Sequence, residues 1–475
     1  MMRHSQRNLF LLIVILICLA SSAFSGAGAF QSSGQTTQSP PSKAAQDQDP
    51  VPVPITAREK PATRSTASTD VTPEQFANFG FPSINNKGEI AFLAYFPDPA
   101  KAQTYGHAIF VRMPDGTWRV SYVKEKTLND NWVMTGYSTP TIADNGDLAF
   151  SGNFGEPNAA PSGDAHLNPA SSSEKPSVNA GIFIKTAAGI KNVTQLGDEV
   201  PRMPSKFTGF SQPTLNSKGA MAFIGTYGDP DGRGLFIYDK GKLTLVVRSG
   251  QKIAPNDTAV FSEHYYPSRI NERGEVAWYS RIGGAVGGGI FVNRATGVEA
   301  IALQTKPSPI KGANYIGFGQ IPPGINDKGD VAFVGFYDGP NNGRALFVKE
   351  GNAPVKVVAK SGDNIPGTTS NFTSFDKPVI NNRGEIAFIG SYGGRMRGIF
   401  LKTAKGIETI AMTDQKAPGA GKEDTFNNFT PPTINDRGEV VFYAQLKNST
   451  VGIFIKDATG FHPLVMRGDK LPTTK

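Results

Sequence analysis

The chain has 475 residues, of which 39% are hydrophobic and 19% charged, with 53 glycines, 35 prolines and a single cysteine. This length exceeds what one hydrophobic core usually serves, so many small modules or a repeat architecture are expected. Glycine shows no three-residue period, which excludes collagen, and an aromatic content of 10% excludes a wholly disordered chain. The formal charge of +8, to which Arg3 and Arg7 contribute two, is too small for this length to predict a nucleic-acid partner or an anionic membrane.

Residues 1–29 have the pattern of a secretory signal peptide. Arg3 and Arg7 precede an apolar run over residues 9–20, and Ala27-Gly28-Ala29 supplies the small residues that signal peptidase accepts. The run is too short for a comfortable membrane span, and its retention as an N-terminal anchor is the alternative. Cys18 lies inside this run, so the mature chain has no thiol for disulfides or catalysis. We expect a secreted, periplasmic or cell-surface protein with no membrane span in the mature chain.

Residues 30–72 have the composition of a disordered linker. Serine, threonine, glutamine, proline and alanine dominate, as in Ser39-Pro40-Pro41-Ser42 and Pro52-Val53-Pro54, and aromatic residues are nearly absent. Such a segment cannot bury enough apolar surface to offset the loss of chain entropy on folding. We therefore expect a semi-extended tether that leads into a folded part beginning near residue 73.

Residues 73–475 repeat one short motif seven times. The stretch at 84–92 reads Ile-Asn-Asn-Lys-Gly-Glu-Ile-Ala-Phe, and it returns at 325–333 as Ile-Asn-Asp-Lys-Gly-Asp-Val-Ala-Phe. The glycines of the seven copies are Gly88, Gly146, Gly219, Gly274, Gly329, Gly384 and Gly438. Their spacing sets a unit of about 55 residues. The second unit is longer because of an insertion around 154–179, which is either a recognition loop or a disordered segment.

Each unit contains four short strands in the same order. An aromatic pair such as Phe207 and Phe210 comes first, and a proline and the Ile-Asn turn follow it. The Glu-Ile-Ala-Phe strand comes next, with a small residue two places beyond its aromatic residue. A strand ending in Ile-Phe or Leu-Phe follows, and then a last apolar strand such as residues 356–359, which often runs into a Gly-Asp pair.

The turn between the first two strands has a defined chemistry. An asparagine at its first position, such as Asn85, can cap the backbone two residues further on. A glycine at the fourth position, such as Gly88, supplies a positive φ at no steric cost. These are the residues that a tight β-hairpin connection with a glycine bulge needs.

The strand after the turn is apolar on both sides, which decides the architecture. Ile90 and Phe92 point one way while Ala91 and Leu93 point the other. A two-sheet sandwich leaves one face of each sheet in water, whereas radially stacked blades cover both. The sequence therefore predicts an all-β, seven-bladed β-propeller of four-stranded antiparallel blades over residues 73–475, with an open β-solenoid as the alternative. We expect side-chain packing alone to close the ring, because the last repeat ends with its own fourth strand near Val465.

The motif Asn-x-x-Gly-x-x-Ala-Phe resembles the NxxGxxAF tandem-repeat proteins, a class of bacterial exported proteins, over residues 76–475. Its turn and strand are also similar to the blade motif of TolB-type propellers. The resemblance implies export and a propeller-like repeat, and it brings no established activity and no catalytic residues. Two features depart from the family: Ala143 stands where asparagine is expected, and the C-terminal sorting anchor of many members is missing.

The candidate binding residues fall on the rim opposite the Asn-x-x-Gly turns. That rim gathers the loops between the second and third strands and the links between successive blades. The candidate ligand-binding residues are Arg233, Arg344, Arg397, Asp229, Asp231, Asp198, Asp363 and Asp469. Arginines on several loops around one mouth can hold a carboxylate or a sulfated or uronic sugar. The alternative is that Gly-Arg-Gly only closes hairpins and Gly-Asp only caps turns.

The sequence contains no recognisable catalytic or metal-binding motif. The histidines after residue 29 form no His-x-His or Glu-x-x-His pair, and neither a Gly-x-Ser-x-Gly elbow nor a phosphate-binding glycine loop is found. We therefore predict no catalytic residue, no metal and no cofactor. The repeats are mutually alike, which favours a monomeric, non-catalytic binding module for a protein, peptide or glycan at the cell envelope or outside the cell. The alternative is an extracytoplasmic carbohydrate-active enzyme, a lyase or hydrolase, with its site on the loop rim or in the channel.

Overall fold

The computed structural model describes residues 74–97, 105–123, 127–129, 132–155, 178–228, 232–253, 259–264, 267–283, 287–339, 342–421 and 424–472. The predicted signal peptide (1–29) and linker (30–72) lie outside these residues, as does most of the insertion around 154–179. All regular secondary structure in the described part is β-strand. No helix in that part is long and apolar enough to cross a membrane.

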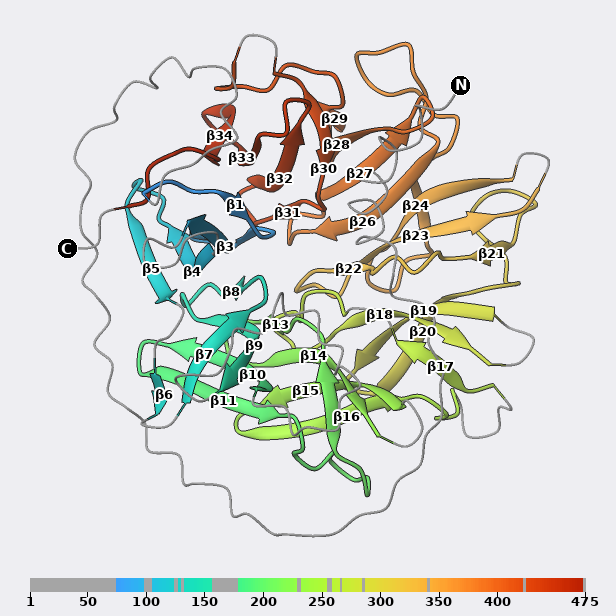
Figure 1. Ribbon diagram of the computed structural model, residues 1–475. Coiled ribbons are helices and arrows are strands. Elements are labelled where there is room, and N and C mark those ends of the chain that lie inside the picture. The colour runs from blue at the N-terminus through green and yellow to red at the C-terminus, as the bar shows by residue number, and fades with distance from the viewer. Residues whose placement is uncertain are drawn as a thin grey trace, which may run out of the picture. The chain divides into compact units, whose positions relative to one another are not determined.

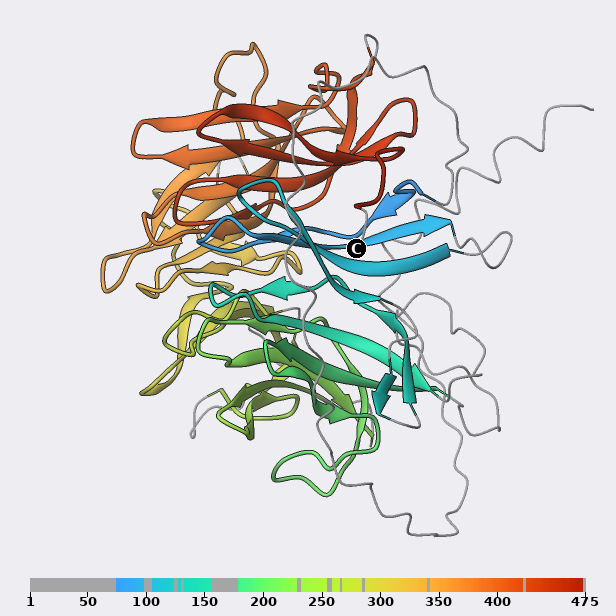
Figure 2. The ribbon, with the colours of Figure 1, turned by 90° about the vertical axis from the view of Figure 1, so that its left-hand side faces the viewer.

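Seven antiparallel sheets follow one another along the chain and surround a common axis as the blades of a propeller (Figure 1). Each blade has an inner strand, which is broken into two short segments in five of the seven, and three further strands toward the outside. In the side view, the strands run between two rims (Figure 2). The predicted seven-bladed propeller of four-stranded blades is confirmed.

The strands are assigned to the blades as follows. Blade 1 contains β1 (Asn78–Phe79), β2 (Ser83–Ile84), β3 (Ile90–Pro97), β4 (Tyr105–Arg112) and β5 (Trp118–Val123). Blade 2 contains β6 (Thr127–Asn129), β7 (Trp132–Tyr137), β8 (Thr141–Ile142), β9 (Leu148–Gly155), β10 (Val178–Thr186) and β11 (Gly189–Gln195). Blade 3 contains β12 (Phe207–Phe210), β13 (Thr214–Leu215), β14 (Met221–Tyr227), β15 (Gly232–Asp239) and β16 (Lys242–Arg248). Blade 4 contains β17 (Phe261–His264), β18 (Ala277–Ile282), β19 (Gly287–Arg294) and β20 (Gly297–Leu303). Blade 5 contains β21 (Tyr315–Gly317), β22 (Gly324–Ile325), β23 (Val331–Tyr337), β24 (Gly343–Lys349) and β25 (Lys356–Lys360). Blade 6 contains β26 (Ser374–Ile380), β27 (Ile386–Tyr392), β28 (Met396–Thr403) and β29 (Gly406–Met412). Blade 7 contains β30 (Phe426–Phe429), β31 (Thr433–Ile434), β32 (Val440–Leu446), β33 (Val451–Asp457) and β34 (Gly460–Met466).

Every blade pairs two aromatic rings across its second and third strands. In blade 3, Phe223 lies opposite Phe236, and their ring centroids are 5.7 Å apart at an interplanar angle of 17°. A Cβ added to Gly225 would lie 2.6 Å from the Phe207 ring and 2.8 Å from the Phe236 ring. This close packing is the physical reason for the small residue two places beyond each strand aromatic.

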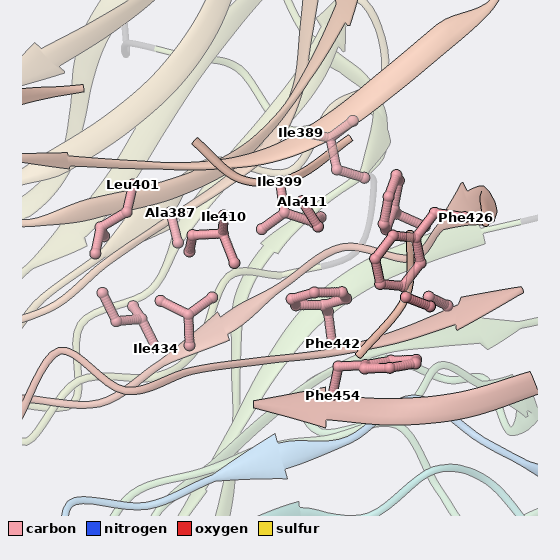
Figure 3. Close-up of a cluster of buried hydrophobic side chains, with 14 of the residues drawn as sticks. Ala387, Ile389, Ile399, Leu401, Ile410, Ala411, Phe426, Ile434, Phe442 and Phe454 are labelled. Atoms are coloured by element: carbon pink, nitrogen blue, oxygen red, sulfur yellow. The ribbon is translucent and has the colours of Figure 1, made fainter. Parts of the chain in front are cut away.

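The hydrophobic cores lie between neighbouring blades. Between blades 6 and 7, Ile389 and Ile399 from one blade pack against Phe426, Phe442 and Phe454 from the next (Figure 3). The same packing recurs between other neighbouring blades, so that the face of one sheet covers the face of the next. The expectation that both faces of each sheet are buried is therefore confirmed.

The Asn-x-x-Gly turns have the predicted geometry and a further role. The Asn85 side-chain oxygen accepts the backbone N–H groups of Lys87 and Glu89 at 3.1 and 2.9 Å, and Gly88 has a φ of +84°. The Asn85 amide donates to the backbone carbonyl of Ala143 in the next blade at 2.9 Å. This inter-blade bond recurs at Asn216, Asn271, Asn326, Asn381 and Asn435. Ala143 has no amide to donate, and blade 2 keeps the second inter-blade bond of the repeat, in which the backbone N–H of the next residue, Asp144, donates to the Ser217 hydroxyl at 3.0 Å.

Backbone hydrogen bonds also close the ring, which corrects the expectation of side-chain packing alone. Phe76 donates its N–H to the Asp469 carbonyl at 2.9 Å, and Gly468 donates to the Phe76 carbonyl at 2.9 Å. Consecutive blades are joined in the same way, as where Gly197 donates to the Phe207 carbonyl. The link between the first and last blades therefore repeats the links described between other neighbours, and among the described strands none is exchanged between these two blades.

Candidate binding rim

The loop rim is defined here by the links between blades and by the starts of the third strands. The candidate residues that lie on described parts of it are the arginines of blades 3, 5 and 6 and three link aspartates. Asp229 and Asp231 lie outside the described residues.

The three link aspartates hold the turns in which blades end. Asp198 accepts the backbone N–H of Gln195 at 2.9 Å, and Asp363 accepts that of Lys360 at 2.9 Å. Asp469 accepts the backbone N–H of Met466 at 2.7 Å. One carboxylate oxygen of each aspartate is therefore engaged in a local cap, which is the alternative that the sequence left open for them.

The three candidate arginines occupy equivalent positions at the start of the third strand. Arg233 lies opposite Thr226, Arg344 opposite Phe336, and Arg397 opposite Ser391. Blade 4 carries an arginine on the same rung, because Arg281 on β18 lies opposite Gly288 on β19. Directly opposed residues of an antiparallel pair project from the same face of the sheet. Four successive blades thus present an arginine at this level. Arg281 is not predicted by the repeat pattern, because it comes from the second strand of its blade and not from the third.

Arg344 and Arg397 converge on one strand, β26 of blade 6. The Arg344 guanidinium lies 4.8 Å from the centre of the Phe336 ring and donates from Nη1 to the Ser374 hydroxyl at 2.7 Å. Arg397 Nη2 lies 3.6 Å from Asp376 Oδ2. Arg344 therefore reaches across the boundary between blades 5 and 6, and two of the three candidate arginines contact the same strand, at Ser374 and at Asp376. We call Phe336, Arg344, Ser374, Asp376 and Arg397 the blade 5–6 cluster.

Arg233 does not join this cluster. It lies in blade 3 with an exposed side chain, and its backbone carbonyl accepts the Ser249 N–H at 2.9 Å and the Tyr227 hydroxyl at 3.2 Å. It is therefore a natural comparison residue, because it shares the strand position of Arg344 but lies in another blade.

The strand that receives the two arginines departs from its counterparts. β26 is continuous, whereas five blades break this strand in two, and its register shifts between Asp376 and Val379. Lys377 has a φ of +38°, which is unusual for a residue with a side chain and all the more so before a proline. In blade 5, Gly324 allows the Pro378 carbonyl to approach, since a Cβ there would lie 2.7 Å from that oxygen.

Burial shapes the charge of the blade 5–6 cluster. It raises the pKa of the half-buried Asp376 carboxyl, and the charges of Lys377 and Arg397 oppose this rise. Asp376 and Ser374 are not among the residues predicted from the sequence. The available signal was the charged Asp376-Lys377 pair before the proline, where another repeat has Ser211-Gln212.

The blade 5–6 cluster contains two guanidinium groups, which can pair with anions, and one carboxyl group. Guanidinium groups pair with carboxylates and sulfates through two parallel N–H donors. The Arg397–Asp376 contact of 3.6 Å is longer than a hydrogen bond, so the Arg397 donors are not committed to that carboxylate. Among the residues that the structure describes, no group of three or more His, Cys, Asp or Glu side chains is arranged to hold a metal ion.

Comparisons with known proteins concern the family and the fold. A model of a family of unknown function, DUF7453, matches residues 53–289 and again 283–474. No protein with a curated description matches the chain.

Several solved structures are similar to the chain at low identity. The β-propeller domain of the trilobed protease from Pyrococcus furiosus is 11% identical, with 83% of this chain and 99% of that chain covered and a TM-score of 0.46. Prolyl oligopeptidase B from Galerina marginata is 11% identical, with 85% and 52% covered and a TM-score of 0.44. The polysaccharide lyase Uly1 is 10% identical, with 86% and 96% covered and a TM-score of 0.41. At this level the likenesses carry no argument about activity, which has to come from the residues of this chain.

Proposed function

The chain belongs to DUF7453, a family of unknown function, and from its own residues we propose that it is an exported, non-catalytic binding module for an acidic glycan. The ligand class is a carbohydrate with uronic or sulfated sugars. The signal-like residues 1–29 and the resemblance to the NxxGxxAF proteins support export.

One observation carries the proposed binding site. Arg344 from blade 5 and Arg397 from blade 6 both turn to β26, where Arg344 is held by Phe336 and by a hydrogen bond of 2.7 Å to Ser374. Arg344 is already held in place, so it can engage a carboxylate or sulfate with little further loss of side-chain freedom, and Arg397 supplies uncommitted donors on the same strand. The exposed position on the loop rim leaves room for a chain of sugars.

A binding comparison tests this proposal. We would titrate the full chain with an oligogalacturonate and with an uncharged oligosaccharide of equal length, and repeat both with Arg344→Ala, Arg397→Ala and Arg233→Ala. We expect saturable binding of the oligogalacturonate alone, weakened roughly tenfold by either of the first two changes, as loss of a charged hydrogen-bonded contact does. Arg233→Ala is expected to bind like the parent. Equal binding of both sugars, or equal effects of all three changes, would refute the proposal.

The carbohydrate-active enzyme remains the second candidate because of Asp376. A half-buried carboxyl whose pKa is raised by burial can hold the proton that a general acid donates. The same titration separates the two functions, since a lyase or hydrolase would shorten the oligogalacturonate during incubation. If the parent shortens the oligogalacturonate and Asp376→Asn does not, the result would favour the enzyme over the binding module.

A further inference from the structure

The links between blades share a plug position, which an apolar residue (Val200, Ile253, Ile365 or Ala417) occupies in four links and a serine occupies in the link from blade 4 to blade 5. In two links, the backbone N–H groups of Val200 and Ile365 donate across the link to the carbonyls of Ser205 and Ser370 at 2.8 and 2.9 Å. The side chains of Val200 and Ile365 are buried, with 2% and 1% of their surface exposed, and they fill the gap between blades. In the link from blade 4 to blade 5, the residue with the same bond is Ser308, whose N–H donates to the Ala313 carbonyl at 2.9 Å.

A pocket of about 390 Å³ lies at this unplugged link. Its walls come from β20 of blade 4, from the link itself and from the residues just before β25 of blade 5. The lining is largely apolar and includes Ala302, Leu303, Pro307 and Val355. This volume is within the range of small-molecule pockets, roughly 300–1,000 Å³.

A second departure from the repeat lies in the same wall. Tyr315 lines the pocket at a position where five other blades carry phenylalanine. The Tyr315 side chain is buried, and its hydroxyl has no hydrogen-bond partner among the described residues. A polar group that is buried without a partner costs stability, so this hydroxyl is unexplained by folding alone.

A positively charged side chain lies at the edge of the pocket. Lys306 lines it and is exposed, and its ammonium group forms no hydrogen bond or ion pair with a described residue. An apolar cavity with a cation at its edge is complementary to a molecule that has an apolar body and one negative charge.

We propose that the blade 4–5 pocket binds a small amphipathic carboxylate. The apolar body lies where Val200 and Ile365 place their side chains in other links, and the carboxylate pairs with Lys306. The hydroxyl of Tyr315, which lines the same pocket, is available as a hydrogen-bond donor to the ligand. This site is separate from the blade 5–6 cluster and does not depend on the proposed glycan function.

Octanoate is a suitable probe, and the full chain is the protein to use. Binding would be followed by ligand-observed NMR, with octanol as the uncharged analogue and acetate as the analogue without an apolar body. We expect saturable binding of octanoate and no binding of acetate. Lys306→Met should weaken octanoate binding about three- to fivefold, as expected for one exposed ion pair, and leave octanol binding unchanged. Lys311→Met, at a lysine of the same link that does not line the pocket, should bind octanoate like the parent.

Ser308→Ile tests the pocket itself, because it restores the residue found at Ile365. We expect this variant to lose octanoate binding and to unfold at a higher temperature than the parent. Ser308→Val repeats the test with the smaller side chain found at Val200, so that one poorly folded variant does not decide the outcome. Octanoate binding that survives in both variants, equal effects of Lys306→Met and Lys311→Met, or no binding by the parent up to millimolar octanoate would each overturn the proposal.

Discussion

The side-chain amide of Asn435 donates a hydrogen bond of 3.0 Å to the backbone carbonyl of Asn85, which lies 350 residues earlier in the chain. Both asparagines are buried. The same bond joins Asn326 to Asn381 between consecutive blades at 3.0 Å. The first and last blades are therefore held as blades 5 and 6 are, through polar groups that water cannot reach once the ring is closed.

Removing the hydrogen bond between Asn435 and Asn85 should destabilise the propeller. Asn435→Ala leaves the Asn85 carbonyl and the backbone N–H groups of Arg437 and Glu439 without their partner. We expect the free energy of unfolding to fall by about 1–3 kcal/mol, measured by urea denaturation. Asn352→Ala, at an exposed asparagine of blade 5, should change it by less than about 0.5 kcal/mol. An Asn435→Ala variant as stable as its control would contradict the structural role of the asparagine ring.

The small residues of the second strands should be intolerant of one added methyl group. A Cβ at Gly390 would lie 2.6 Å from the Phe372 ring and 2.7 Å from the Phe400 ring. Gly390→Ala should therefore lower the free energy of unfolding by about 1–3 kcal/mol through overpacking. Gly228→Ala is the matched control, because its nearest neighbour would be the Thr208 methyl group at 3.8 Å. If the two variants are similarly stable, packing against the aromatic rings does not limit the size of the residue at this position.

Tyr315→Phe should stabilise the chain when no ligand is present. The change removes a buried hydroxyl that has no described partner and restores the residue of five other blades. We expect a gain of about 1 kcal/mol in thermal or urea unfolding. Tyr392→Phe is the comparison, since that hydroxyl donates to the Thr413 carbonyl at 3.3 Å and its loss should not stabilise. A destabilised Tyr315→Phe variant would indicate a partner for this hydroxyl in solution.

Asp376 should make the protein less stable as the pH rises through the acidic range. Burial raises the pKa of Asp376 above its ordinary value of 3.8, so the folded chain keeps this proton to a higher pH than the unfolded chain does. Stability is therefore lost as the pH rises from 3.8 to the folded pKa, and Asp376→Asn should gain stability relative to the parent over that window.

Asp115 is the control for this pH dependence, and its effect on stability changes with pH in the opposite direction. Hydrogen bonds from the Thr117 N–H and hydroxyl lower the pKa of Asp115 below 3.8. Asp115 therefore contributes stability that is present above 3.8 and lost as the pH falls through its folded pKa. Asp115→Asn should lose stability relative to the parent as the pH rises. Urea unfolding between about pH 2.5 and 7 measures both variants, and slopes of the same sign would contradict the assignment.

The sequence predicts the propeller because its signals are local and repeated. A glycine every 55 residues or so fixes seven hairpins, and the apolar residues on both sides of the strand at 90–94 require cover on both faces. The Asn85 cap and the positive φ of Gly88 follow from the turn residues alone. The small residue at Gly225 is visible as a pattern, although its packing against Phe207 and Phe236 is not.

The blade 5–6 cluster could not be predicted because it depends on how two blades stack. Arg344 and Ser374 are 30 residues apart and meet only when blade 5 lies against blade 6. The continuous form of β26 comes from a register shift near Asp376, which no single-repeat pattern encodes. The backbone hydrogen bonds that close the ring are not predicted by the sequence for a similar reason, since Phe76 and Asp469 pair only once all seven blades are in place.

A double-mutant cycle on Arg344 and Arg397 tests the central claim most directly. Oligogalacturonate binding would be measured by calorimetry for the parent, Arg344→Ala, Arg397→Ala and the double variant. If the two guanidinium groups hold one ligand, the two losses of binding free energy should not add, and the coupling should be at least about 0.5 kcal/mol. Losses that add within error, or a parent chain that binds no oligogalacturonate, would contradict the account.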